Sequence, residues 1–344
     1  ISSDMLEAAL TAGILSVGGD VLSVGTIPTP AVAFLARQEG ADAGIVISAS
    51  HNPYEHNGIK LFSGQGYKLS DEVEGRIEDR ILSEAPMKLR TRGEIGRLVS
   101  DGGRRKVDYI DFVASTISED LHGMRILVDC ANGAASATAP ELFGRFQAHT
   151  DFIHRAPDGV NINHRCGSTH LEDLAQAGVR GGYINEGCGS THLDKLAKYV
   201  VDNGLDCGVA FDGDADRCLL VDETGGVIDG DKVMAVCALD MKRRGELNGN
   251  TIVATVMSNM ALEVFMKERG GTLIRTNVGD RHVVAAMRQQ GALLGGEQSG
   301  HLIFREYSTT GDGLLAALQI LRIMRQRGRP LSELAGLLVP YPQE

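Results

Sequence analysis

Residues 208–217, GVAFDGDADR, decide the fold class of this chain. The first four residues are small or apolar, and carboxylates at Asp212, Asp214 and Asp216 follow them directly. A short apolar run bounded by a turn is typical of a fully buried strand. Polar side chains directly after a buried strand lie at the sheet edge where α/β proteins bind their ligands. The segment therefore predicts a buried strand that ends in an acidic loop.

Apolar runs and amphipathic stretches alternate along the rest of the chain. The pattern predicts buried strands at 43–47, 125–128, 208–211, 219–221, 252–256 and 273–276, and helices at 72–82, 259–267 and 314–324. In the last helix we expect the leucines on one face and Arg322 on the other. Thr29 before Pro30 is the expected N-cap of a further helix. This alternation predicts an α/β protein with mixed, largely parallel sheets.

Composition indicates a globular protein of two or three domains. The chain has 344 residues, of which 43% are apolar and 23% charged, with a formal net charge of −11. The acidic balance argues against nucleic-acid binding, and no apolar run is long enough to span a membrane. The six cysteines form no C-x-x-C pair, which favours reduced thiols and a cytoplasmic protein. Domain boundaries are expected near 118–123, 229–231 and Pro340.

One segment is duplicated. Residues 162–174 recur at 184–196 with nine of thirteen positions identical. A single tandem copy is too short for a repeat protein, so we interpret it as an insertion accommodated by one surface loop. The second copy continues into an amphipathic pattern at Leu196 and Val200, which predicts a helix. Because the insertion precedes the acidic loop, we expect that loop to be intact.

The acidic loop predicts a metal site. Three carboxylates at alternate positions converge only when something neutralises them, and a hard divalent cation such as Mg²⁺ prefers oxygen ligands. Two alternatives are a calcium EF-hand with Glu223 at its twelfth position and a solvated acidic turn. Arg217, where an EF-hand has glycine, and the strand-like flanks argue against the EF-hand.

Three further loops carry candidate functional residues. Residues 48–53, SASHNP, follow a predicted strand; they place a serine where ligands bind or form an Asn-Pro turn with capping serines, and Lys60 ten residues later is a candidate catalytic or surface lysine. Residues 295–301, GGEQSGH, either present Glu297 and Ser299 to a polar ligand or form a tight hairpin. Residues 278–281, VGDR, either bind an anion at a helix start or provide Asp280 as an N-cap.

These loops, in this order, resemble the α-D-phosphohexomutase superfamily, and most of all its bacterial phosphoglucosamine mutases. Supporting motifs are GTIPTP at 25–30, NGIK at 57–60 and PDGVNIN at 157–163. The resemblance covers nearly the whole chain apart from the duplicated stretch. It implies consecutive α/β domains at 1–118, 119–229 and 230–338, with 339–344 as the stub of a fourth.

The resemblance also implies a mechanism and a set of site residues. Glucosamine 6-phosphate and glucosamine 1-phosphate would interconvert through a phosphoserine and a 1,6-bisphosphate, supplying UDP-N-acetylglucosamine and cell-wall precursors. Mg²⁺ is the implied cofactor and a hexosamine or glucose 1,6-bisphosphate the implied activator; the partner is a phosphosugar, and the oligomeric state stays open. The implied catalytic residues are Ser50, Lys60 and His51; the substrate-binding residues are Glu297, Ser299, His301, Arg281, Asp280 and Arg217; the metal ligands are Ser50, Asp212, Asp214 and Asp216.

The chain departs from the superfamily pattern at both ends. The opening G-T-D-G-x-R-G segment and the phosphate-binding loop of the fourth domain are absent from this sequence. We expect the first domain to have an incomplete sheet and exposed apolar surface. The alternative functions are a phosphomannomutase/phosphoglucomutase, an inactive phosphosugar-binding fragment, and a phosphatase.

Overall fold

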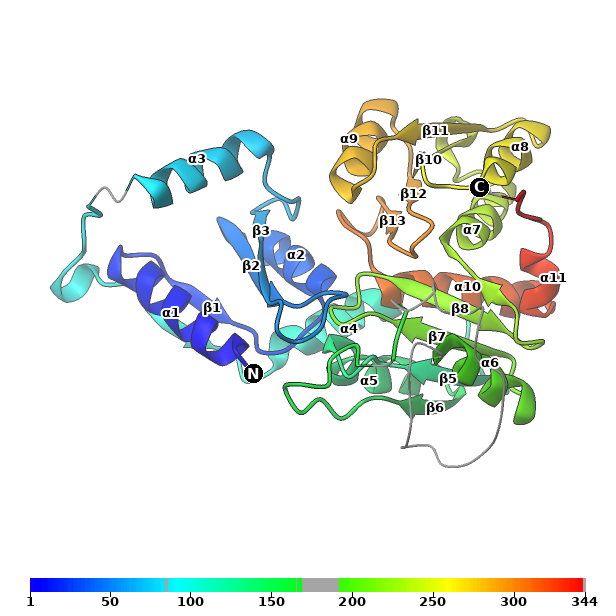
Figure 1. Ribbon diagram of the computed structural model, residues 1–344, viewed down its shortest axis with the longest axis horizontal. Helices are drawn as coiled ribbons and strands as arrows, with labels where there is room; N and C mark the ends of the chain where they lie inside the picture. The colour runs from blue at the N-terminus through cyan, green and yellow to red at the C-terminus, as the bar shows by residue number, and fades with distance from the viewer. Residues whose placement is uncertain (84–85, 165, 169–191, 343–344) are drawn as a thin grey trace.

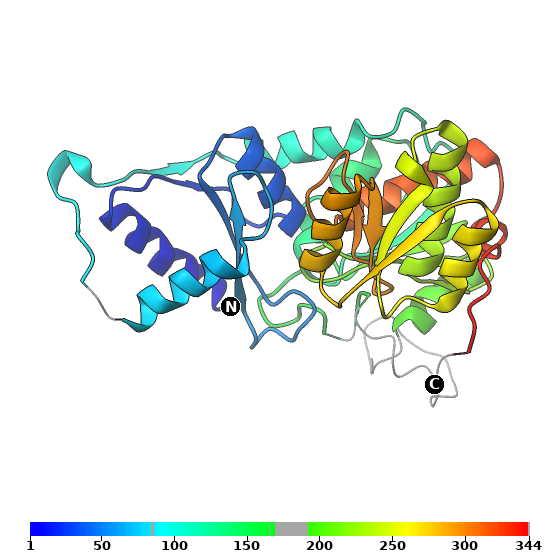
Figure 2. The same cartoon turned by 90° about the horizontal axis from the view of Figure 1, so that it is seen from above.

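The computed structural model describes residues 1–83, 86–164, 166–168 and 192–342. In the described part, residues 1–100 form one end of an elongated molecule, and two larger sheets with their helices form the other (Figures 1 and 2). Most of the duplicated segment lies outside the described residues, and with it the predicted loop insertion. No helix among the described residues has the length and apolarity that a bilayer crossing requires.

The first part of the chain combines helices with two small sheets. Strand β1 (Val21–Ser23) pairs in parallel with β4 (Leu98–Ser100), and β2 (Ala43–Ser48) pairs antiparallel with β3 (Gly58–Ser63). The helices are α1 (Ser3–Ser16), α2 (Thr29–Gln38), α3 (Asp71–Leu82) and α4 (Arg104–Ala114). The expected exposed apolar surface is present here, at Met5, Ile59, Ile81, Leu98 and Val99 among others.

The middle sheet contains the strand that precedes the acidic loop. Its order is β6-β5-β7-β8-β9, parallel from β6 to β7 and antiparallel from β7 to β9. The strands are β5 (Arg125–Asp129), β6 (His149–Ile153), β7 (Cys207–Phe211), β8 (Cys218–Asp222) and β9 (Val227–Ile228), with helices α5 (Ala139–Gly144) and α6 (His192–Asp202). Leu196 and Val200 of α6 pack against Leu127 and Leu219, which confirms the helix predicted at the second copy of the repeat.

The third sheet has the order β11-β10-β12-β13, with only the β12–β13 pair antiparallel. Its strands are β10 (Thr251–Thr255), β11 (Thr272–Thr276), β12 (Leu294–Gly296) and β13 (Leu302–Phe304). The helices are α7 (Gly230–Arg244), α8 (Met260–Glu268), α9 (Asp280–Gln290), α10 (Gly313–Arg327) and α11 (Leu331–Ala335). Short 3₁₀ turns at 92–94, 134–137 and 248–250 complete the elements. The α/β class with mixed sheets is confirmed.

Two local predictions were wrong. Helix α10 is buried on all sides from Gly313 to Met324, because it packs against α4, α7, β8 and β13. Arg322 therefore does not face solvent; its guanidinium pairs with the buried Asp240 carboxylate at 2.7 Å. Thr29 is the first residue of α2 and not its N-cap, and its hydroxyl donates instead to Asp214 in the acidic loop.

A buried hydrogen bond links α4 to the start of α10. The Tyr109 hydroxyl lies 2.9 and 3.0 Å from the two carboxylate oxygens of Asp312, which also caps α10 by accepting from the Leu315 amide. Burial raises the pKa of Asp312 to about 6, against the opposing effect of these hydrogen bonds. Because this pKa lies above its unfolded value, the carboxyl stabilises the fold at low pH, and that contribution is lost as pH rises through about 6.

Replacing Asp312 with asparagine should remove this pH dependence. Asparagine keeps the N-cap acceptor and can accept from Tyr109, but it does not ionise. We expect the free energy of unfolding of D312N, relative to wild type, to increase as pH rises from about 5 to about 7. Denaturant unfolding across this range measures the difference, with the exposed-carboxylate variant D202N as control. Parallel stability curves for D312N and wild type would contradict the assignment.

Candidate active site

Ser50 lies in a strained turn directly after β2. Its φ of 55° is in the left-handed region, which a residue with a side chain rarely adopts and which recurs at functional sites. The Ser50 amide donates to Ser48 Oγ at 2.8 Å, and the Asn52 amide donates to the Ala49 carbonyl at 2.9 Å. The predicted turn is thus present, and within it Ser48, not Ser50, provides the capping hydroxyl.

The acidic loop between β7 and β8 is buried. Asp212, Asp214 and Asp216 are 0, 2 and 5% exposed, so the alternative of a solvated acidic turn was wrong. The flanking elements are antiparallel strands, which excludes a helix–loop–helix EF-hand. One ligand oxygen from each carboxylate lies within 4.8 Å of the other two, as the metal-site prediction requires.

The serine turn and the acidic loop contact each other closely. A side chain at Gly213 would place its Cβ 2.4 Å from the Ser50 carbonyl oxygen, so only glycine permits this approach. Ser50 Oγ donates to Asp214 Oδ1 at 3.3 Å. The two sequence-predicted features, whose residues Ser50 and Asp214 are 164 positions apart along the chain, therefore form one site.

Lys60 and His51 are the other side chains that approach the Ser50 hydroxyl. Lys60, on β3, places its Nζ 3.4 Å from Ser50 Oγ, 2.5 Å from Asp214 Oδ2 and 3.4 Å from Asp216 Oδ2. His51 Nδ1 is 3.4 Å from Ser50 Oγ. Partial burial acts to lower the pKa of Lys60, but the Asp216 and Asp214 carboxylates outweigh it and raise that pKa. The Lys60 amine is therefore held as an ammonium beside the serine hydroxyl.

The electrostatics of the acidic loop fit a divalent cation. Burial, and next the charges of Asp216 and Asp214, raise the pKa of Asp212. Burial acts to raise the pKa of Asp216, but the charges of Lys60 and His301 outweigh burial and hold that pKa well below its usual range. Among the described residues, Asp212 Oδ2 and Asp216 Oδ1 are buried without a hydrogen-bond partner. Buried anionic oxygens lacking donors are the ligands that Mg²⁺ takes.

The GGEQSGH segment connects β12 and β13 as a hairpin, so that alternative was correct, and the hairpin also faces the site. Glu297 Oε1 accepts from the Gly279 amide at 3.1 Å, and Ser299 Oγ lies 3.5 Å from Glu297 Oε2. His301 is 4% exposed; its Nδ1 is 3.7 Å from Asp216, while its Nε2 accepts from the Gly311 amide at 3.0 Å.

Asp280 and Arg281 connect this side of the site to the first part of the chain. Asp280 is the first residue of α9, with Gly279 at the N-cap position, so the N-cap interpretation was wrong. Its carboxylate pairs with Lys68 Nζ at 2.6 Å. The Arg281 guanidinium pairs with Asp71 and Glu74 of α3.

Arg217 was also expected at the site. Its backbone amide donates to Asp212 Oδ1, and its side-chain Nε is buried without a hydrogen-bond partner among the described residues.

Asn163 belongs to the PDGVNIN motif, but the sequence pattern indicated no role for its side chain. This side chain is 3% exposed, and its Nδ2 lies 2.6 Å from the Ser50 carbonyl and 3.0 Å from the Asn52 carbonyl. Thr29, which bonds Asp214, and Lys68 were missed as well. Each acts through a contact between segments far apart in sequence, so local pattern gives no signal for it.

Replacing Asn163 with alanine should slow the phosphoryl transfer at Ser50 that the resemblance implies, while leaving the implied metal binding nearly unchanged. The variant removes the Asn163 donor from two partly buried carbonyls of the strained turn, at a cost of up to about 1–3 kcal/mol. We expect phosphorylation of Ser50 by a hexose 1,6-bisphosphate to slow by about tenfold or more. Asn161, in the same loop but bonded within it, provides the control N161A. Equal rates for N163A and wild type would rule out the positioning role.

Comparison with known proteins identifies this arrangement. Models of the phosphoglucomutase/phosphomannomutase family match residues 1–87 (alpha/beta/alpha domain I), 107–226 (domain II) and 229–341 (domain III). The chain therefore belongs to this family of α/β phosphohexomutases. A family protein from Burkholderia thailandensis superposes with a TM-score of 0.78 at 25% identity, over 98% of this chain and 69% of that one.

Curated relatives show which phosphohexomutases the chain is similar to over its whole length. The phosphoglucosamine mutase of Nitratidesulfovibrio vulgaris strain DP4 is 52% identical over 349 residues, and that of Acetivibrio thermocellus 49% identical over 344; each match covers all of this chain and 72% of the relative. These relatives support phosphoglucosamine mutase function. The fold is shared with an Aspergillus fumigatus N-acetylphosphoglucosamine mutase solved with GlcNAc-6P and magnesium (TM-score 0.65, 18% identity, over 99% of this chain and 84% of that one).

Proposed function

We propose that this chain interconverts glucosamine 6-phosphate and glucosamine 1-phosphate by phosphoryl transfer through Ser50. The observation that carries the proposal is the convergence of Ser50 Oγ from the turn after β2, Lys60 Nζ from β3 and three buried carboxylates from the loop between β7 and β8. A nucleophilic hydroxyl, an acid–base group and a cation site are the parts that phosphoryl transfer needs. The assignment of the parts to domains 1–118, 119–229 and 230–338 belongs to the same proposal.

Ser50 is the group that carries the phosphoryl. In the forward step the bond from phosphorus to Ser50 Oγ breaks and a bond to a sugar hydroxyl oxygen forms, giving the 1,6-bisphosphate. After the bisphosphate turns over, its other phosphoryl returns to Ser50 Oγ and the isomeric monophosphate leaves. The strained turn, held by Asn163, fixes the position of Oγ and lowers the entropic cost of alignment.

Lys60 moves the proton in this scheme. Its ammonium lies 3.4 Å from Ser50 Oγ, so it can protonate that oxygen as the phosphoryl departs, and the attacking sugar hydroxyl gives up its proton to restore the ammonium. Both proton transfers reverse when the phosphoryl returns to Ser50. His51 Nδ1, at the same distance from Oγ, helps to orient the hydroxyl. Asp214 bonds Ser50, Lys60 and Thr29, and so holds the acid–base pair together.

Asp212, Asp214, Asp216 and Ser50 would hold the cation, with Mg²⁺ proposed. A bound Mg²⁺ supplies charge neutralisation for the transferring phosphoryl oxygens. The unpartnered oxygens of Asp212 and Asp216 support this assignment.

The sugar-binding side is formed by Glu297 and Ser299, whose acceptors suit hydroxyl and amino groups. His301, Asp280, Arg281 and Arg217 complete the proposed phosphosugar site; Arg281 must first release the α3 carboxylates to bind a phosphate. The five cysteines in the described residues are buried thiols, which supports our placement of the enzyme in the cytoplasm.

A single-turnover comparison of sugars tests the proposal. Chain phosphorylated on Ser50 is mixed with glucosamine 6-phosphate, mannose 6-phosphate or glucose 6-phosphate, and loss of the phosphate is followed by intact mass. We expect glucosamine 6-phosphate to discharge the enzyme at least about tenfold faster than the others. The family description also covers phosphoglucomutases and phosphomannomutases, so faster discharge by glucose or mannose phosphate would favour that alternative. Release of free phosphate without sugar would indicate a phosphatase.

A further inference from the structure

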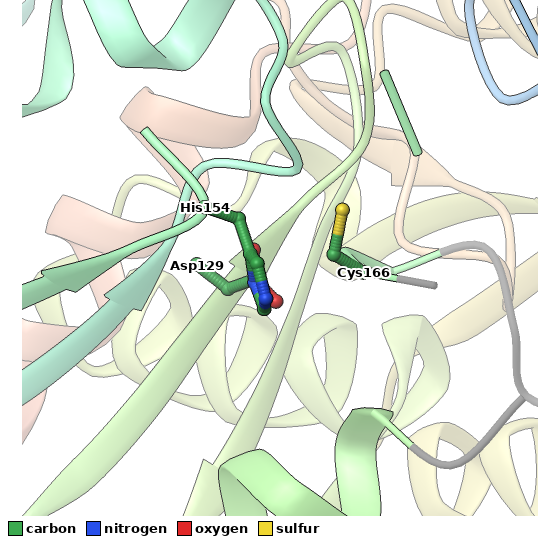
Figure 3. Close-up of side chains that lie close together, drawn as sticks. All are labelled: Asp129, His154 and Cys166. Atoms are coloured by element: carbon green, nitrogen blue, oxygen red, sulfur yellow. The ribbon is translucent and has the colours of Figure 1, made fainter. Parts of the chain in front are cut away.

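A second cluster of metal-binding groups lies on the middle sheet, apart from the acidic triad. Asp129 ends β5, His154 directly follows β6, and Cys166 lies in the loop that approaches both strand ends (Figure 3). One ligand atom from each side chain lies within 4.8 Å of the other two. Asp129 and Cys166 are buried, and the His154 side chain is 27% exposed.

The donor set differs in kind from that of the acidic triad. A thiolate, an imidazole and a carboxylate are the ligands that Zn²⁺ and similar transition metals take, whereas Mg²⁺ avoids sulfur. A thiolate and a carboxylate together neutralise a divalent ion, so the loaded site would bury no net charge.

Neighbouring groups hold the ligands in place. Asp129 Oδ1 accepts from the Ala131 amide at 2.9 Å, and Oδ2 accepts from the Gly167 amide at 3.0 Å. Asn132 Nδ2 lies 3.8 Å from Cys166 Sγ, where it donates to the sulfur and favours the thiolate. Outer contacts of this kind orient metal ligands and raise affinity.

The spacing is close to that of a tetrahedral centre. His154 Nδ1 and Asp129 Oδ1 are 3.0 Å apart. With metal–ligand bonds of about 2.0–2.3 Å, the ligand atoms of a tetrahedral zinc site are about 3.3–3.8 Å apart. The ligand atoms of Asp129, His154 and Cys166 would therefore reach tetrahedral spacing after side-chain shifts of about 1 Å.

We propose that Asp129, His154 and Cys166 bind one transition-metal ion of the Zn²⁺ type, with solvent as the fourth ligand. The site is separate from the Mg²⁺ site and does not depend on the proposed function. It has a structural consequence, because Cys166 is three residues from Asn163, which holds the Ser50 turn. An ion at this site would fix the loop that positions the serine.

Cobalt binding tests the proposal without any substrate. The full chain is saturated with Mg²⁺ and titrated with Co²⁺, and absorption is recorded in the near ultraviolet, where only thiolate ligation gives charge-transfer bands. We expect such bands with wild type, their loss in C166S, and at least about tenfold weaker binding in H154Q, whose partly exposed position should tolerate the change. The neighbouring buried thiol provides the control C130S, which should behave like wild type.

Three results would overturn the proposal. Wild type without a thiolate band would show that the cluster is held by hydrogen bonds alone. Bands retained in C166S but lost in C130S would assign the ligand to Cys130. Equal Co²⁺ affinity in H154Q and wild type would remove His154 from the site.

Discussion

Replacing Lys60 with methionine is expected to slow phosphorylation of Ser50 by at least about a hundredfold. The variant keeps the aliphatic length of the side chain but removes the ammonium 3.4 Å from Ser50 Oγ. The same change removes a cation 2.5 Å from Asp214, which competes with a divalent ion for the carboxylates. Mg²⁺ affinity should therefore be unchanged or higher while transfer is lost.

These opposite effects separate an acid–base role from a structural one. Transfer is measured by intact mass after mixing with glucose 1,6-bisphosphate, and Mg²⁺ binding by calorimetry. The exposed Lys198, which pairs with Asp202 on α6, provides the control K198M. A wild-type rate of phosphoryl transfer in K60M would show that Lys60 takes no part in the reaction. Loss of both transfer and Mg²⁺ binding would show that Lys60 has a structural role in the acidic loop.

Replacing Asp212 with asparagine is expected to weaken Mg²⁺ binding by at least about a hundredfold and to abolish transfer. The same variant should be more stable than wild type when no metal is bound. Burial and the neighbouring carboxylates raise the pKa of Asp212 above its unfolded value, so this group loses stabilising effect as pH rises toward neutral. The uncharged amide avoids that repulsion.

Thermal unfolding with EDTA and with Mg²⁺ measures both effects. Wild type should unfold at higher temperature with Mg²⁺ than with EDTA, and D212N should show no such shift. Asp222, a buried carboxylate that accepts from the Thr224 and Gly226 amides in the next turn, provides the control D222N. That variant should be less stable but keep the Mg²⁺ response. A full response in D212N would contradict the metal assignment.

The sequence predicted the strands and the acidic loop well because these depend on local pattern. The predicted strand 208–211 is β7, which begins one residue earlier, and the carboxylates after it are buried together. Where the local sequence pattern gave a wrong prediction, tertiary packing determined the environment of the side chain. Arg322 was expected on the polar face of an amphipathic helix, but α10 is buried on all sides and Arg322 pairs with Asp240.

Contacts between segments far apart in the sequence could not be predicted from the local pattern of residues. Thr29 looked like a helix cap, and its partner Asp214 is 185 residues away. Asn163 and the Asp129–His154–Cys166 cluster likewise depend on strand ends that only the sheet order brings together. The resemblance gave residue roles, but not the ion pairs that hold Arg281 on α3.

We propose that Ser50 carries a phosphoryl group during the reaction. The direct measurement is the intact mass of the full chain after incubation with glucose 1,6-bisphosphate and Mg²⁺, followed by peptide mapping. We predict one phosphate per chain on Ser50, none in S50A, and retention of the phosphate in S48A, which keeps the nucleophile. An unmodified wild-type chain, or a phosphate on any other residue, would contradict the mechanism.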